Sequence, residues 1–169
     1  IEERKNLLSL IKVLKIMKSK NLVVIGDGKD YKKKCLDYIK NNNLQKRIFF
    51  KHNLHLEEIA IAYRNASILV YPSIYEGFGI PILEALYSKI PVITTKGGCF
   101  EEAGGTHTKY IDTKNTEEIV SAIKEIEDNP DIRKEMIDNG YAHAKTFCDK
   151  SVNEKLNNIY SDLVNGNRS

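Results

Sequence analysis

Short apolar runs alternate with helical segments along most of this 169-residue chain, and this alternation limits its possible folds more than any other feature. One run, residues 22–25, is followed directly by glycine, which is typical of a strand buried on both faces of a parallel sheet. Just before it, apolar residues between positions 6 and 17 recur at spacings of three and four, the pattern of an amphipathic helix. The same alternation continues to about residue 111.

Strands and helices that alternate at this spacing along the sequence predict right-handed crossovers and an α/β fold built on a Rossmann-like, doubly wound parallel sheet. From Thr116 onward the pattern is helical only, with breaks at Asn129-Pro130 and Asn139-Gly140, so three helices are expected to close the chain. Gly97-Gly98-Cys99 is expected to be a loop. The expected strands are residues 22–25, 47–50, 67–71, 91–94 and 109–111, and the expected earlier helices are residues 6–17, 31–41, 56–65 and 80–87.

Residues 1–169 are expected to form one domain, because no internal repeat, linker or change in composition divides them. The chain begins without a methionine, inside the charged run Ile1-Glu2-Glu3-Arg4-Lys5. It also opens with a helix, whereas sheets of this kind normally open with a strand. We therefore expect a fragment of a larger two-domain protein, from which the first strand and an N-terminal domain are missing.

Charge and cysteine content argue against several classes of protein. The 26 Lys and Arg are mixed with 23 Asp and Glu, so the net charge of +3 gives no reason to expect a nucleic-acid partner. No apolar stretch approaches the ~18 residues of a membrane span. Three widely spaced cysteines fit neither a disulfide framework nor a Cys-based zinc site, which favours a cytoplasmic location. The four histidines are too scattered to be metal ligands, so no metal is expected.

Ligands of open parallel sheets bind at the carboxyl ends of the strands, so the loops that leave the apolar runs are the candidate sites. The first loop, Gly26-Asp27-Gly28, lacks the third glycine of the dinucleotide-binding fingerprint. No Asp or Glu is obviously placed at the end of the next strand either. The two glycines are therefore as consistent with a tight turn between strand and helix as with a ligand loop.

The loop after residues 67–71 is more informative. Two glycines follow the strand closely, and Pro81 stands just inside the next helix, where its missing N–H costs nothing. The backbone N–H groups of Phe78, Gly79 and Ile80 are then expected at a helix N-terminus, where the peptide dipoles and unpaired donors favour an anion. This pattern predicts a phosphate site.

Two carboxylates flank this expected phosphate site. Glu76 lies in the loop before the helix, and Glu84 lies about one turn inside it and is expected to lean back toward the same opening. Each carboxylate is a natural double acceptor for a vicinal diol, so the ligand that suits both is a nucleoside diphosphate sugar. Taken singly, Glu84 is equally consistent with a surface residue and Glu76 with an acid that stabilises the helix dipole.

The sequence strongly resembles the retaining glycosyltransferases of family 4, a branch of the GT-B superfamily. The resemblance spans nearly the whole chain and includes the family's Glu-x7-Glu motif as Glu76 and Glu84. It is carried by Tyr63-Arg64-Asn65-Ala66, Val70-Tyr71-Pro72-Ser73, the run from Glu76 to Ala85, and Ile90-Pro91-Val92-Ile93.

The resemblance implies the carboxyl-terminal, donor-binding domain of such an enzyme, with roles for individual residues. Lys5 matches the lysine that contacts the donor diphosphate, Glu76 the glutamate near the transferred sugar, and Glu84 the one that holds the ribose. Phe78, Gly79 and Ile80 match amides that contact sugar and phosphate. Gly26 and Asn53 are assigned to donor binding, although the loop around Asn53 departs from the family's Gly-containing form and leaves the base undecided. The family's arginine about six residues before the lysine would precede Ile1, and its role is not given to Arg4.

The expected activity is retaining transfer of a sugar from a UDP- or GDP-linked donor, without cofactor or metal, with Glu76 and Lys5 as catalytic residues. The expected acceptor is a glycan or lipid-linked molecule bound through the missing domain, in bacterial polysaccharide, lipopolysaccharide or capsule synthesis. The expected location is the cytoplasm, including the inner face of the membrane. Two alternatives remain open: an NAD-type Rossmann module that uses Gly26 and Gly28, and a non-catalytic binding subunit.

Overall fold

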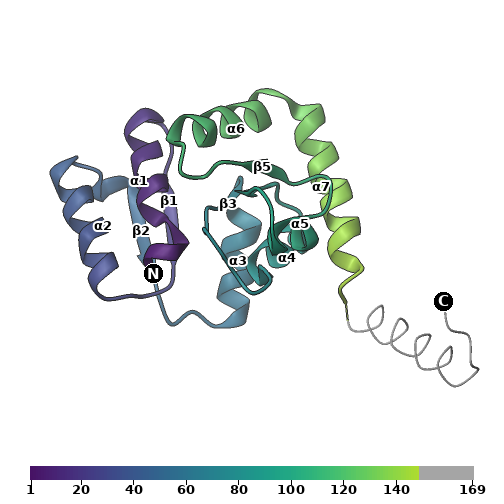
Figure 1. The fold of residues 1–169 in the computed structure, drawn as a ribbon, viewed down its shortest axis with the longest axis horizontal. Helices are drawn as coiled ribbons and strands as arrows, with labels where there is room; N and C mark the ends of the chain where they lie inside the picture. Colours follow the sequence, from purple (N-terminus) through teal and green to yellow (C-terminus); the bar gives the residue numbers. More distant parts are fainter. Residues whose placement is uncertain (149–169) are drawn as a thin grey trace, which may run out of the picture.

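The computed structural model describes residues 1–148, which form parallel strands flanked by helices (Figure 1). The α/β class predicted from the sequence is confirmed. The strands are β1 Leu22–Ile25, β2 Ile48–Lys51, β3 Leu69–Tyr71, β4 Val92–Thr95 and β5 Lys109–Ile111. The helices are α1 Leu7–Ile16, α2 Asp30–Asn41, α3 Leu56–Asn65, α4 Ile80–Tyr87, α5 Cys99–Gly104, α6 Thr116–Asp128 and α7 Pro130–Lys145, with short 3-10 turns at Glu3–Lys5 and Gln45–Arg47.

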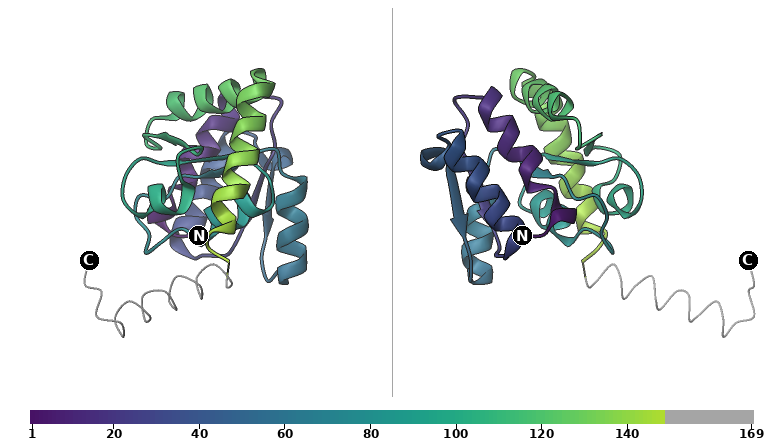
Figure 2. Two further views of the ribbon diagram at one scale, coloured as in Figure 1. Left: turned by 90° about the vertical axis from the view of Figure 1, so that its right-hand side faces the viewer. Right: turned by 60° about the vertical axis from the view of Figure 1, so that its left-hand side comes forward.

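The strands pair in two groups in the described part of the chain. β1 pairs with β2, and β4 lies between β3 and β5, with every pair parallel. α1 and α2 accompany β1 and β2 at one side of the molecule, whereas α4 to α7 gather around β3 to β5 (Figure 1), and the right-hand view of Figure 2 shows the same division. The expected strands thus form, but they do so in two adjacent sheets.

Helix α1 holds the two groups together, because it is buried along two stripes. Leu7, Ile11 and Leu14 pack in the cluster that contains β1, β2 and α2. Leu10 and Val13, offset by a few positions around the helix, pack in the cluster that contains β4, β5 and α6. The three-and-four spacing recognised in the sequence therefore serves two cores, since neighbouring rows of a helix face different directions.

Burial of the strands follows the expectation in β4 but not in β1. Val92 packs toward α4 and α5, and its neighbour Ile93 packs toward α1 and α6, so β4 is covered on both faces. In β1 and β2, by contrast, Val23, Ile25 and Phe49 are 54%, 42% and 44% exposed. The prediction that residues 22–25 are buried on both faces is therefore wrong, because in this structure one face of this sheet is left largely uncovered.

Two local predictions in the second half of the chain are also wrong. Helix α7 continues through Asn139-Gly140, and Gly140 serves close packing instead of a break, since a Cβ there would lie 2.6 Å from Cδ2 of Leu86. Cys99 begins the short helix α5, so only Gly97 and Gly98 form the expected loop. Of the three closing helices, α6 and α7 are present, and the rest of that prediction falls on residues 149–169, outside the described part.

Candidate functional site

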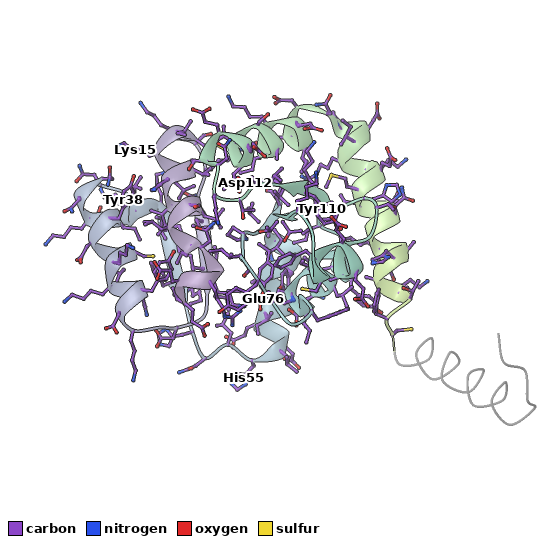
Figure 3. All side chains as sticks on the ribbon, in the orientation of Figure 1. Lys15, Tyr38, His55, Glu76, Tyr110 and Asp112 are labelled. Carbon is purple, nitrogen blue, oxygen red and sulfur yellow. The ribbon has the colours of Figure 1, made fainter. Side chains whose placement is uncertain are left out.

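Glu76 is the centre of a partly buried polar cluster that follows β3. Its side chain is 11% exposed, and Figure 3 places it near the middle of the molecule, beside the amino-terminal end of α1. Its Oε1 accepts hydrogen bonds from Lys5 Nζ at 2.5 Å, Ser73 Oγ at 2.7 Å and Tyr71 OH at 2.9 Å. Its Oε2 accepts one from Arg4 Nη1 at 2.7 Å. We call these five residues, Arg4, Lys5, Tyr71, Ser73 and Glu76, the Glu76 cluster.

The two cations reach Glu76 because the first turn of the chain lies against the loop after β3. The backbone N–H of Ile74 donates to the carbonyl of Arg4 at 2.7 Å. Asn6 then joins the first turn to α1 with a φ of 52°, a left-handed conformation that asparagine tolerates better than most residues. The Asn6 side chain also donates to the carbonyl of Thr113 at 3.0 Å, which fixes this corner against the end of β5.

Two threonine hydroxyl groups bind the backbone of the loop that carries Glu76. Thr95 Oγ1 donates to the carbonyl of Ser73 at 2.6 Å, and Thr113 Oγ1 donates to the carbonyl of Pro72 at 3.2 Å. The two threonine oxygens lie 2.8 Å apart. Ser73 itself is fully buried, so its bond to Glu76 is shielded from water. The carboxyl ends of β3, β4 and β5 thereby fix the position of the Glu76 carboxylate.

The cluster holds Glu76 firmly in its charged form. Burial pushes the pKa of Glu76 upward, but the hydrogen bonds from Lys5, Ser73, Tyr71 and Arg4 outweigh it and lower the pKa to about 2. Burial opposes the charge of Lys5 as well, yet its bonds to Glu76 and Tyr71 leave its pKa raised. Both cations are therefore charged at neutral pH, and with one carboxylate between them the three ionised groups carry a net charge of +1.

The amino-terminal end of α4 lies next to Glu76 in the chain. Gly79 precedes the helix with a φ of 112°, which explains why glycine stands there, and no side chain caps the helix. Ile80 is the first helical residue and Pro81 follows it, as the sequence predicted. The open helix end leaves backbone donors available for a ligand, which is the arrangement expected for the amides of Phe78, Gly79 and Ile80.

Glu84 belongs to a different set of contacts from Glu76. Its Oε2 accepts a hydrogen bond from Tyr63 OH at 2.9 Å, and burial together with the Glu84 charge raises the pKa of Tyr63. Both residues line a largely apolar cavity of about 410 Å³ between α3, α4 and the residues after α7. No hydrogen bond joins Glu76 to Glu84 in the described residues, and a shared ligand for the two carboxylates stays a prediction.

The remaining predicted residues lie at the carboxyl ends of β1 and β2. Gly26 follows β1 with a φ of 131°, and its N–H donates to the carbonyl of Lys51 at 2.8 Å. Asn53 follows β2 and has a φ of 53°. Between them, the exposed Asp27 pairs with Lys32 at 2.6 Å. These loops lie at the same edge of the strands as the Glu76 cluster, as expected for parallel strands.

Residues 1–143 match the protein family described as Glycosyl transferases group 1. The chain belongs to this family. O-antigen chain mannosyltransferase RfbU of Salmonella typhimurium (strain LT2) is 37% identical to it over 128 residues, which cover 75% of this chain and 36% of the relative. The chain therefore spans about a third of the length of this curated relative.

Solved structures of similar fold include a member of the same family. The C-terminal domain of the glycosyl transferase group 1 family protein LpcC of Francisella tularensis has a TM-score of 0.76 and 29% identity, covering 87% of this chain and 81% of that one. HepE of Anabaena, solved in complex with UDP and glucose, has a TM-score of 0.83 and covers 96% of this chain and 46% of its own, but at 20% identity it shows the fold alone. The predicted fold, the C-terminal half of a GT-B fold, is confirmed.

Several contacts in this glycosyltransferase-family domain were not predicted from its sequence. The family resemblance gives Arg4 no role, although its side chain donates a hydrogen bond directly to Glu76. The family pattern includes Tyr71, Ser73 and Tyr63 without giving them a role. In the structure Tyr71 and Ser73 donate to Glu76, and Tyr63 donates to Glu84. The three-residue spacing from Ser73 to Glu76 across a loop was the signal that could have pointed to this bond.

Residues 1–148 contain neither a cluster of metal ligands nor a helix that could span a membrane. Among residues 1–148, no three His, Cys, Asp or Glu side chains gather closely enough to hold a metal ion. Over the same residues, every helix is too short or too polar to cross a bilayer.

Proposed function

We propose that this chain is the donor-binding domain of a glycosyltransferase that moves a sugar from a nucleoside diphosphate to a glycan or lipid-linked acceptor. One observation carries the proposal: the Glu76 cluster, with its excess positive charge, adjoins the open end of α4 at the carboxyl ends of the strands. Cations and helix amides suit a diphosphate, and a carboxylate beside them suits the hydroxyl groups of a sugar.

The mechanism follows from where charge develops during transfer. As the bond to the sugar breaks, negative charge grows on the departing diphosphate and the sugar becomes oxocarbenium-like. Lys5 and the amides of Phe78, Gly79 and Ile80 stabilise the departing diphosphate, because fixed donors need no rearrangement as the charge appears. Glu76 orients the hydroxyl groups of the sugar and stabilises its positive ring, while Glu84 accepts the ribose hydroxyls. Retention of configuration is proposed on the family resemblance.

The similarity to an O-antigen mannosyltransferase supports assembly of a bacterial surface polysaccharide as the process. It also makes mannose the first donor sugar to test, with GDP and UDP as the candidate nucleotides. We propose no cofactor and no metal, since Lys5 and the end of α4 supply the positive charge that a bridging cation would otherwise provide.

We also propose that a strand and a further domain precede Ile1 in the complete enzyme. β1 and β3 each have one edge without a strand partner in the described residues, and the strand pairs within each group are parallel. The Ile1 amine donates to the carbonyl of Asp27 just after β1, and Arg4 binds Ile74 just after β3. Residues 1–4 thus cross the carboxyl ends of both edges, where a strand running between them would emerge.

Isothermal titration calorimetry of this chain with GDP, UDP, their mannose and glucose derivatives, and NAD tests the proposal. We expect weak binding of one nucleotide and its sugar derivative, no binding of NAD, and no sugar transfer by the chain alone. Lys5→Ala should weaken this binding about tenfold or more, the usual effect of losing a charge-assisted hydrogen bond. Lys46→Ala, an exposed residue before β2 at the opposite edge, is the matched control. Binding of NAD in preference to both nucleotides would favour the oxidoreductase-type alternative.

A further inference from the structure

The position of Arg4 suits ligand binding better than a purely structural role. Its Nη1 donates to Glu76 Oε2 at 2.7 Å, and the side chain remains 27% exposed. Its Nε donates to the exposed Glu2 at 2.7 Å, and the guanidinium lies 5.7 Å from the ring centre of Tyr75. The guanidinium is thus held at the boundary between the buried carboxylate and solvent, with its remaining N–H donors able to meet an incoming group.

The hydrogen bonds that Glu76 makes in this structure conflict with its proposed role in binding the hydroxyl groups of the sugar. A carboxylate offers about four acceptor sites, and Glu76 already accepts from four donors. Two of the donors, Tyr71 and Ser73, are neutral side chains fixed by the strand end. The other two, Arg4 and Lys5, are cations on long side chains that can turn toward a second anion. Sugar hydroxyls therefore gain full access to Glu76 only when the cations move.

A diphosphate is the group that would draw the cations away. It carries negative charge on each phosphate, and the planar guanidinium of arginine pairs with two phosphate oxygens at once. Without Arg4, the charges of Lys5 and Glu76 would cancel and leave no excess positive charge for the diphosphate. With Arg4, the cluster carries one positive charge in excess. The Arg4 and Lys5 side chains are 27% and 33% exposed, so both cations can be reached from solvent, and the partner that Arg4 has outside the cluster is the exposed carboxylate of Glu2.

We propose that Arg4 binds the donor diphosphate, and that donor binding transfers Arg4 and Lys5 from Glu76 to the phosphates and so releases Glu76 for the sugar. This inference rests on the proposed function and adds a residue and an exchange to it. In the free domain the cations keep the Glu76 carboxylate fixed, and in the complex the same cations neutralise the leaving group. Glu76 and the diphosphate thus compete for one pair of cations.

Competition makes opposite predictions for two variants, measured by calorimetry of this chain with whichever of GDP and UDP the wild type binds. Arg4→Gln should weaken binding of the nucleoside diphosphate about tenfold or more. Glu76→Gln should strengthen it several-fold, because it removes the competing anion. Lys46→Gln removes the same charge as Arg4→Gln from the opposite edge and should change the affinity less than twofold. The salt dependence of binding should also be shallower for Arg4→Gln than for wild type, since one fewer charged contact is made.

Other outcomes would overturn the inference in distinguishable ways. Wild-type affinity in Arg4→Gln would remove Arg4 from the donor site and leave the proposed function intact. Weaker binding in Glu76→Gln would show that the carboxylate supports diphosphate binding, so the exchange would be wrong. Failure of the wild-type chain to bind either diphosphate would contradict the proposed function as well. If circular dichroism shows that Arg4→Gln does not fold, Arg4→Lys is measured in its place. This variant keeps the charge but loses the planar guanidinium, so its affinity for the nucleoside diphosphate should lie between that of wild type and that expected for Arg4→Gln.

Discussion

Replacing Glu76 with glutamine removes the negative charge at the centre of the Glu76 cluster while nearly preserving the shape of the side chain. The pKa of Glu76 is lowered from 4.5 to about 2 by the folded structure. At about 1.36 kcal/mol per pKa unit, the ionised carboxylate contributes about 3 kcal/mol to the free energy of unfolding at pH 7. The glutamine variant, which resembles the protonated acid, should be less stable than wild type by about this amount.

The sign of the pH dependence follows from the direction of the shift. Because the pKa of Glu76 is lower in the folded state, its contribution is fully present above pH 4.5 and is lost as the pH falls toward 2. At pH 3 about 1.4 kcal/mol of it remains, so the stability difference between wild type and Glu76→Gln should shrink by about 2 kcal/mol between pH 7 and pH 3. Other acidic groups titrate in both proteins and cancel in the difference.

Urea unfolding followed by circular dichroism at pH 7 and pH 3 measures this difference. The expected result is a large destabilisation of Glu76→Gln at pH 7 that is less than half as large at pH 3. A difference between the two proteins that is equal at both pH values would show that the four donors do not stabilise the carboxylate. A variant more stable than wild type at pH 7 would show that burial of the charge outweighs its hydrogen bonds.

Further substitutions test the supporting structure by urea unfolding. Gly79→Ala should destabilise the domain by about 1–3 kcal/mol, because alanine does not adopt a φ of 112° without strain. Gly77→Ala is the control: a Cβ there has no atom within 4 Å, so stability should change by less than about 0.5 kcal/mol. Equal effects of the two substitutions would contradict backbone strain at Gly79. Arg47→Ala should cost about 1–3 kcal/mol, because Arg47 donates to the carbonyls of Leu14, Met17 and Lys20 at the end of α1. An unchanged midpoint for Arg47→Ala would show that these bonds add nothing to stability.

The sequence predicted a helix or strand well wherever all the local signals in a segment favoured the same element. Residues 80–87 have glycine before the helix, proline at its start and apolar residues on one side, and α4 has the predicted bounds. Gly140 shows where such signals fail, because a glycine that breaks a helix and a glycine that admits Leu86 look alike in one sequence. The exposure of Val23 and Phe49 was equally invisible, since an apolar run does not say what covers it.

The site could be predicted in part for the same reason. Glu76 and the end of α4 are local to one loop, so their proximity follows from the chain itself. The bonds to Arg4 and Lys5 join residues more than 70 positions apart, and only the folded chain shows that Arg4 also turns toward Glu76. The contact between Glu84 and Tyr63 likewise requires α3 to lie against α4, which periodicity alone does not determine.

The central claim is that a nucleoside diphosphate sugar binds at the Glu76 cluster and the open end of α4. Backbone amide NMR of the ¹⁵N-labelled chain, titrated with GDP-mannose and UDP-glucose, tests it most directly. We predict that the amide resonances of Phe78, Gly79 and Ile80 shift together and saturate at one concentration of the bound nucleotide sugar. Unchanged resonances for these three amides, with shifts confined to other parts of the domain, would contradict the claim.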